Sequence, residues 1–133
     1  MDSTPIVRIV KQQSTGDCVI AVLAMYFCMD YEDVLGAAVL VNKAKRIHRV
    51  GMYDYQILET AKALKHPLIK RRTFDLETSC GILSLLHKRP QKDSHVVLLK
   101  NGLIFDTDAT VWEPDIYFDN AKFKPVAIFE KDE

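Results

Sequence analysis

The feature that most constrains the fold is an apolar run near the N-terminus. Residues 18–29, from Cys18 to Met29, are almost wholly apolar, whereas residues 12–17 before them are polar and rich in helix-capping types. A run of this length, made of good helix formers and preceded by a capping loop, is typical of a buried helix. The sequence therefore predicts a central helix that begins at or near Cys18.

The rest of the chain predicts helices first and strands afterwards. Apolar residues at helical spacing predict three further helices, over residues 32–43, 53–65 and 76–87. Short β-branched or apolar runs predict strands at residues 6–10, 68–73 and 125–130. Asn101-Gly102 between the apolar runs 95–99 and 103–106 is a strong hairpin signal. This order of elements predicts an α+β fold.

Length and composition limit the classes of protein that fit. With 133 residues, no repeat and no long linker, residues 1–133 are expected to form a single domain. Eighteen basic residues balance eighteen acidic ones, which argues against nucleic acid as the main partner. No stretch approaches the roughly 18 apolar residues of a membrane span, and residues 1–11 lack the pattern of a signal peptide.

The cysteines indicate the compartment and argue against a metal centre. There are three of them, Cys18, Cys28 and Cys80, without CxxC spacing. An odd number of dispersed cysteines favours free thiols in a reducing compartment, so a cytoplasmic location is expected. No cluster of His, Cys or Asp has metal-ligand spacing, so neither a metal nor another cofactor is expected.

Cys18 is the candidate nucleophile. A thiol attacks a carbonyl as its thiolate, and the N-terminus of a helix favours negative charge. The predicted helix start places Cys18 there. Cys28 and Cys80 fall inside predicted helices among apolar neighbours, where cysteine is usually inert packing. From position alone, Cys18 fits either a nucleophile or one more buried thiol.

His95 is the candidate general base. A two-residue turn at Asn101-Gly102 would pair Leu98 with Phe105, Val97 with Asp106 and His95 with Asp108, and would put His95, Val97, Asp106 and Asp108 on one face of the hairpin. Either carboxylate could hold the imidazole in the tautomer that a general base needs. The alternative is a surface histidine near a solvated acidic turn.

Gln12 is a candidate oxyanion-hole residue. Its amide, just before the helix of the nucleophile, could donate to the oxyanion of a tetrahedral intermediate together with the backbone N–H of Cys18. A glutamine in a loop is often only a polar surface residue, so this signal is weak by itself.

Taken in order, these motifs resemble those of a known family. Gln12, a four-residue gap and Asp17-Cys18 lead into a helix; residues 51–53 (Gly-Met-Tyr) precede another; His95 opens an apolar strand and Asp106 ends the next. Over about residues 5 to 130, the chain resembles the C39 family of papain-like cysteine peptidases, which trim double-glycine leaders from bacteriocin and pheromone precursors.

The resemblance implies a papain-like fold, with an N-terminal central helix and further helices packed on a C-terminal antiparallel sheet. It implies Cys18 as nucleophile, His95 as general base, Asp106 as the residue that orients His95, and Gln12 in the oxyanion hole. Two departures stand out. Val19 replaces the glycine that usually follows the cysteine, and the tight His-to-Asp connection leaves Asp108 as an alternative to Asp106. No transporter segment follows, so a stand-alone enzyme is expected.

The leading hypothesis is a cysteine peptidase that hydrolyses a peptide or isopeptide bond of a peptide or protein substrate through an acyl-enzyme. A deamidase or transamidase would use the same residues. A non-catalytic peptide-binding module is the alternative from another class, and a scaffold whose Cys18 is buried and unreactive is a third. Aromatic residues near Pro114 would line a specificity groove or pin a loop to the core: Trp112, Tyr117 and Phe118. His48, in a basic stretch, is expected to lie in a solvated loop.

Overall fold

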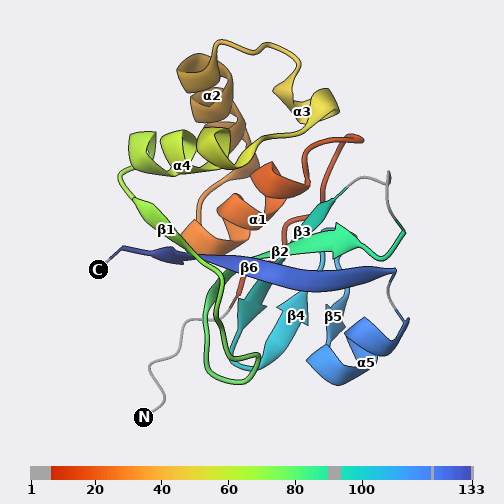
Figure 1. Ribbon diagram of the computed structural model, residues 1–133. Coiled ribbons are helices and arrows are strands. Elements are labelled where there is room, and N and C mark those ends of the chain that lie inside the picture. The colour runs from red at the N-terminus through yellow and green to blue at the C-terminus, as the bar shows by residue number, and fades with distance from the viewer. Residues whose placement is uncertain (1–6, 90–93, 121, 133) are drawn as a thin grey trace.

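A computed structural model of the chain describes residues 7–89, 94–120 and 122–132 (Figure 1). The helices in these residues are α1 (Cys18–Phe27), α2 (Tyr31–Asn42), α3 (Ile47–Val50), α4 (Asp54–Ala63) and α5 (Pro114–Asn120). The strands are β1 (Leu68–Arg71), β2 (Gly81–His87), β3 (His95–Lys100), β4 (Leu103–Phe105), β5 (Val111–Trp112) and β6 (Phe123–Lys131). They form one antiparallel sheet in the order β1-β6-β2-β3-β4-β5. The predicted α+β class is confirmed.

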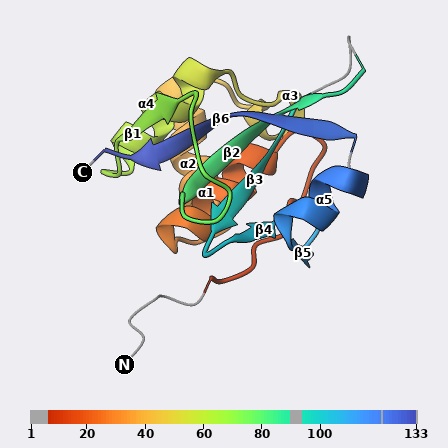
Figure 2. The ribbon, with the colours of Figure 1, turned by 60° about the horizontal axis from the view of Figure 1, so that its bottom comes forward.

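The central helix is confirmed and is buried on all sides. Every residue of α1 after Cys18 is buried, none of them more than 7% exposed. The helix ends at Cys28, which adopts a left-handed conformation with φ of 55°. Figures 1 and 2 show the reason for the burial: α1 lies between the sheet on one side and α2 and α4 on the other. A helix sandwiched in this way needs apolar side chains around its whole circumference.

The sheet carries a hydrophobic core on each face. Along β3, Val96 and Leu98 belong to the larger cluster around α1, whereas Val97 and Leu99 belong to a smaller one. This split follows from the two-residue alternation of a strand. The smaller cluster includes Tyr117 of α5, and α5 lies on the opposite side of the sheet from α2 and α4 (Figures 1 and 2). β3 is therefore buried on both faces.

The predicted hairpin is confirmed in its turn and register. Asn101 and Gly102 have φ of 55° and 73°, as the two central residues of a type I′ turn require, and Leu98 pairs with Phe105. The pairing with β3 stops there, so the predicted pairs of Val97 with Asp106 and His95 with Asp108 do not form. Asp106 instead opens a turn, in which its N–H donates to Thr110 O at 2.9 Å.

Several element predictions are confirmed and two are wrong. The helices at 32–43 and 53–65 correspond to α2 and α4, and the strands at 68–73 and 125–130 to β1 and β6. The predicted helix over 76–87 is instead the strand β2 from residue 81 onward. This strand lies in the middle of the sheet with buried residues on both faces, and such a strand has a continuous apolar run that periodicity cannot distinguish from a helix. Residues 7–10 form no strand, and Ile6 lies outside the described residues.

Cys28 and Cys80 lie outside the helices, contrary to the prediction. Cys28 follows the last residue of α1 and is exposed, and Cys80 immediately precedes β2 and is partly buried. In the part of the chain that the structure describes, no helix is both long enough and apolar enough to cross a membrane.

Candidate active site

The loop before Cys18 folds around a buried carboxylate. Asp17 is fully buried, and it accepts hydrogen bonds from Gln13 N at 2.7 Å, Ser14 N at 2.9 Å and Tyr31 Oη at 2.6 Å. Burial and the neighbouring Asp17 raise the pKa of Tyr31, so its hydroxyl stays protonated as a donor. Because these donors occupy the carboxylate, the side chain of Asp17 makes no capping hydrogen bond to α1. The first N–H groups of α1 beside Cys18 are therefore left without a side-chain cap.

The same loop is pinned to α3 at Gly16. The Gly16 N–H donates to His48 O at 3.1 Å, and Thr15 Oγ1 donates to Arg49 O at 3.3 Å. A Cβ atom on Gly16 would stand 2.5 Å from Arg49 O, a separation that Cβ atoms essentially never adopt in proteins. Only glycine permits this close approach, which fixes the start of α1 against the backbone of α3.

His95 faces Cys18 on one side and Asp106 on the other. His95 Nε2 lies 2.8 Å from Asp106 Oδ1, and Cys18, which lines the same cleft, is near enough to the imidazole to influence its pKa. Burial alone would lower the pKa of His95, but the hydrogen bonds and charges of Asp106 and Cys18 outweigh burial and raise it to about 9. The imidazole is therefore held as an imidazolium at neutral pH. Figure 1 shows how the partners meet: β3 starts beside the N-terminal end of α1.

Asp106, not Asp108, is the carboxylate on His95. Besides His95, Asp106 Oδ1 accepts the N–H of Thr107 at 2.7 Å, and Oδ2 accepts the hydroxyl of Tyr117 at 3.0 Å. Burial opposes ionisation of Asp106, but these donors hold its pKa below the ordinary value. Asp108 is exposed, and its Oδ1 accepts from Thr110 in the turn. The alternative that the sequence left open is resolved by this contact.

Gln12 connects the two halves of the site. Its backbone N–H donates to Thr107 O at 2.9 Å, and its Oε1 accepts the hydroxyl of Thr107. Its amide nitrogen donates to Ser14 O at 2.8 Å and lies 3.5 Å from Asp17 Oδ1. These contacts tie the loop before Cys18 to the residue after Asp106. The amide hydrogens are directed into the loop, so the oxyanion role of Gln12 stays a prediction that needs its amide to be redirected.

Cys18 and His95 open onto a cleft of about 560 Å³. Its other walls come from α1, from the segment that runs from the α2–α3 connection through α3 to the start of α4, and from the sheet, and they include Val19, Arg49, Met52, Tyr53, Asp54 and Ser84. A cleft of this volume is in the range of ligand sites in proteins. Cys18 is partly exposed at its wall, which is the position that attack on a bound molecule requires.

Two aromatic residues support the site: Phe123 was not singled out from the sequence, and Tyr117 was expected there only to line a groove or to pin a loop. Phe123 stacks on His95, with ring centroids 5.3 Å apart, and Tyr117 holds Asp106 as described above. Both come from the C-terminal third of the chain, and only the tertiary fold brings them near Cys18. The aromatic group around Trp112 packs against the smaller core cluster. Trp112 also lines a second pocket of about 300 Å³ beside Asp106, and the specificity-groove role of this group stays a prediction.

In the residues that the structure describes, no group of three or more His, Cys, Asp or Glu side chains has an arrangement that could hold a metal ion. His48 lies in α3 and is half-buried, not in a solvated loop, and its Nδ1 has no hydrogen-bond partner in the described residues. The three cysteines are all free thiols.

No model of a known protein family matches the chain, and a search of curated protein sequences finds no match either. Function has to be inferred from the chemistry of the site itself.

Proposed function

We propose that this protein is a cysteine hydrolase of the papain-like type, similar to the C39 peptidases, in which Cys18, His95 and Asp106 form a catalytic triad. The observation that carries the proposal is the placement of His95. It is hydrogen-bonded to Asp106 and faces the same open cleft as Cys18, which is near enough to raise its pKa. A nucleophile, a base and a group that orients the base, each within hydrogen-bond reach of the next, are typical of covalent catalysis.

In the proposed reaction, the Cys18 thiolate attacks an amide carbonyl of a bound peptide, and a C–S bond forms. The N–H groups at the start of α1 stabilise the oxyanion, because the side chain of Asp17 leaves them uncapped. The His95 imidazolium gives its proton to the leaving amine as the C–N bond breaks. Neutral His95 then takes a proton from water, which hydrolyses the thioester and frees Cys18.

Asp106 stabilises the positive charge on His95 and keeps Nε2 as a donor, which leaves Nδ1 to face the thiol. Val19, the residue in place of the usual glycine, is 4% exposed and packs in the core cluster around α1. Most of its side chain is thereby turned away from solvent, which is compatible with access of a substrate to Cys18.

The competing functions differ in what they require of Cys18. A deamidase or transamidase needs the same triad and differs in the leaving group or the acceptor. A scaffold would have a buried, inert Cys18, whereas this cysteine is partly exposed beside His95. A peptide-binding module needs the cleft but no reactive thiol. Three free thiols support a reducing compartment, and we propose a cytoplasmic location on that basis.

The rate of alkylation of each cysteine by iodoacetamide, followed from pH 5 to 10 by peptide mass spectrometry, tests the proposal. Cys28 is exposed and serves as the internal reference. We expect Cys18 to react roughly tenfold or more faster than Cys28 at pH 6, because an ordinary thiol with a pKa of about 8.5 is almost fully protonated there. His95→Ala should abolish the difference.

Burial raises the pKa of Cys80, so this thiol should react slowest at neutral pH and provides a second reference. If Cys18 follows Cys28 in rate and in pH dependence, or if His95→Ala leaves its rate unchanged, the catalytic proposal fails. The cleft would then be studied as a binding site.

A further inference from the structure

The charged side chains that line the cleft differ in whether they have an ion-pair partner among the described residues. Asp54 forms an ion pair with Lys70, and His95 is paired with Asp106. Arg49 is exposed, and among the residues that the structure describes it forms no ion pair. The cleft thus has one cationic side chain whose partner is not supplied by the described part of the protein.

The backbone holds Arg49 at a defined position relative to Cys18. The Arg49 N–H donates to Arg46 O at 2.9 Å, and Arg49 O accepts from Thr15 and lies against Gly16. Gly16 is two residues before Cys18. The positive charge is therefore attached, through a short and tightly packed connection, to the loop that carries the nucleophile.

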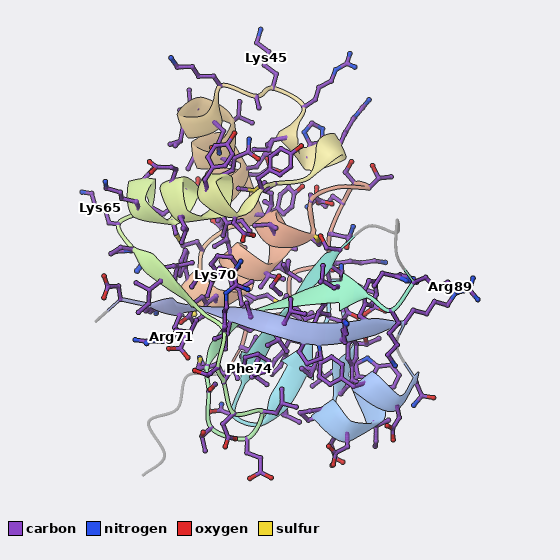
Figure 3. All side chains as sticks on the ribbon, viewed as in Figure 1. Lys45, Lys65, Lys70, Arg71, Phe74 and Arg89 are labelled. Carbon is purple, nitrogen blue, oxygen red and sulfur yellow. The ribbon has the colours of Figure 1, made fainter. Side chains whose placement is uncertain are left out.

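The neighbouring surface has the same sign. Residues 43–53 contain no acidic residue, and their cations are Lys43, Lys45, Arg46 and Arg49. In Figure 3, Lys45 extends into solvent from the connection between α2 and α3, and the residue before it, Ala44, lines the cleft. Since the whole chain has a net charge of zero, this basic edge is a local excess. Clefts lined by one sign of charge attract ligands of the opposite sign.

Apolar surface lies beside the basic edge. Met52 lines the cleft and is half-buried, and Tyr53 is 74% exposed at its wall, where it stacks on Tyr55 with ring centroids 6.2 Å apart. An extended peptide could therefore place an apolar side chain against Met52 and Tyr53 while a neighbouring carboxylate approaches Arg49.

We propose that Arg49 is a specificity-determining residue that binds an Asp or Glu side chain of the peptide substrate, next to an apolar residue held by Met52 and Tyr53. This inference rests on the proposed function, because it assigns the substrate class of the same cleft. The acidic side chain lies on the α3 side of the scissile bond. A guanidinium matches a carboxylate in geometry and charge, and binds it through paired hydrogen bonds.

The substrate-free test compares a charged and a neutral reagent of nearly the same size. Iodoacetate carries a carboxylate and iodoacetamide does not, so the ratio of their rates at Cys18 reports the positive charge in the cleft. We expect Arg49→Met to lower this ratio roughly threefold, the size of an exposed charge–charge interaction. The matched control is Arg72→Met, at the end of the edge strand β1, which should leave the ratio unchanged. About 1 M salt should reduce the wild-type ratio toward that of Arg49→Met.

The second test uses a proteome-derived peptide library, with cleavage sites read by mass spectrometry. Wild type is expected to enrich Asp or Glu at one position near the cleaved bond, and Arg49→Glu to lose that preference or exchange it for Lys and Arg. The inference is overturned if the cleavage sites of the wild type are not enriched in Asp or Glu, or if Arg49→Glu has the same preference as the wild type.

The two proposals fail differently. A Cys18 no more reactive than Cys28 defeats the proposed function. A reactive Cys18 whose iodoacetate-to-iodoacetamide ratio is the same in wild type and Arg49→Met defeats only the role of Arg49. If single-stranded DNA, but not a glutamate-rich peptide, slows the alkylation of Cys18, the ligand of the cleft is a nucleic acid and the peptide assignment is overturned.

Discussion

At the scale of single residues, the site depends on how completely each polar group is satisfied. Both oxygens of Asp106 accept hydrogen bonds, and Tyr117, which supplies the one to Oδ2, is 6% exposed. Burial raises the pKa of Tyr117, so its hydroxyl remains a donor throughout the neutral range. Tyr117 is thus a positioning residue that acts on His95 through Asp106.

Replacing Tyr117 with Phe removes this donor and little else. We expect a loss of about 1 kcal/mol in the free energy of unfolding, because a buried carboxylate oxygen loses its partner. The pKa of Asp106 should rise, since one of the groups that lowers it is gone. The acid limb of the Cys18 alkylation profile should therefore move to higher pH. Tyr55→Phe, at a residue that is 64% exposed, is the control; equal profiles in the two variants would contradict the assigned role.

At the scale of elements, the start of α1 is positioned by contacts with α3 and with the turn after β4. Gly16 allows the first contact and Gln12 makes the second through Thr107, which is 2% exposed. Gly16 and Thr107, through which these contacts are made, both lie in loops, outside the helices and strands. The geometry of the triad therefore depends on loop packing that can be disturbed without breaking a helix or a strand.

Two glycine substitutions separate this contact from general helix propensity. Gly16→Ala should destabilise the protein by roughly 2 kcal/mol, because the new Cβ meets the backbone of Arg49 and one segment must move. It should also reduce the reactivity of Cys18 in the folded protein. Gly36→Ala, in α2, meets no atom within 4 Å and should stabilise the protein by about 0.5–1 kcal/mol. Urea denaturation measures both, and a neutral Gly16→Ala would rule out the tight packing of this loop.

At the scale of the whole molecule, the site lies where two separately packed regions meet. Cys18 belongs to the helical side of the sheet, whereas Phe123 and Tyr117 contact the smaller cluster on the other side. His95 connects the two regions at the start of β3 (Figure 1). The positive charge on His95 gains its partners only when both regions have folded. Protonation of His95 is therefore coupled to the stability of the whole fold.

This coupling predicts a pH dependence of stability. The pKa of His95 is raised from about 6.5 in an unfolded chain to about 9 in the folded protein. The stabilisation is therefore complete below pH 6.5 and is lost as the pH rises through 9. Wild type should exceed His95→Ala in unfolding free energy at pH 6, and this excess should shrink by on the order of 2–3 kcal/mol by pH 10.

Urea titrations of wild type and His95→Ala between pH 6 and 10 measure the effect. Cys18→Ala should lower the pH at which the stabilisation by His95 is lost, because it removes one of the groups that raise the pKa of His95. A difference between wild type and His95→Ala that stays constant across this range would contradict the coupling.

The sequence by itself determined the elements whose signals are local. The apolar run after Asp17 specified α1, and Asn101-Gly102 specified the turn and register of the hairpin, because burial on all sides and a left-handed turn each require particular residue types. The same local signals singled out Cys18, His95 and the candidate carboxylates. They could not distinguish β2 from a helix, because a strand buried on both faces has no alternation.

The tertiary structure decided everything that depends on contacts between distant segments. It selected Asp106 over Asp108, because the pairing with β3 ends at Phe105 and turns Asp106 toward His95. It brought Tyr117 and Phe123 to the triad, and it placed Arg49, which forms no ion pair within the described residues, at the same cleft as Cys18 through Gly16. Hydrogen bonds and ion pairs act over a few ångströms in space, whatever the separation along the chain, so spacing in the sequence alone does not reveal them.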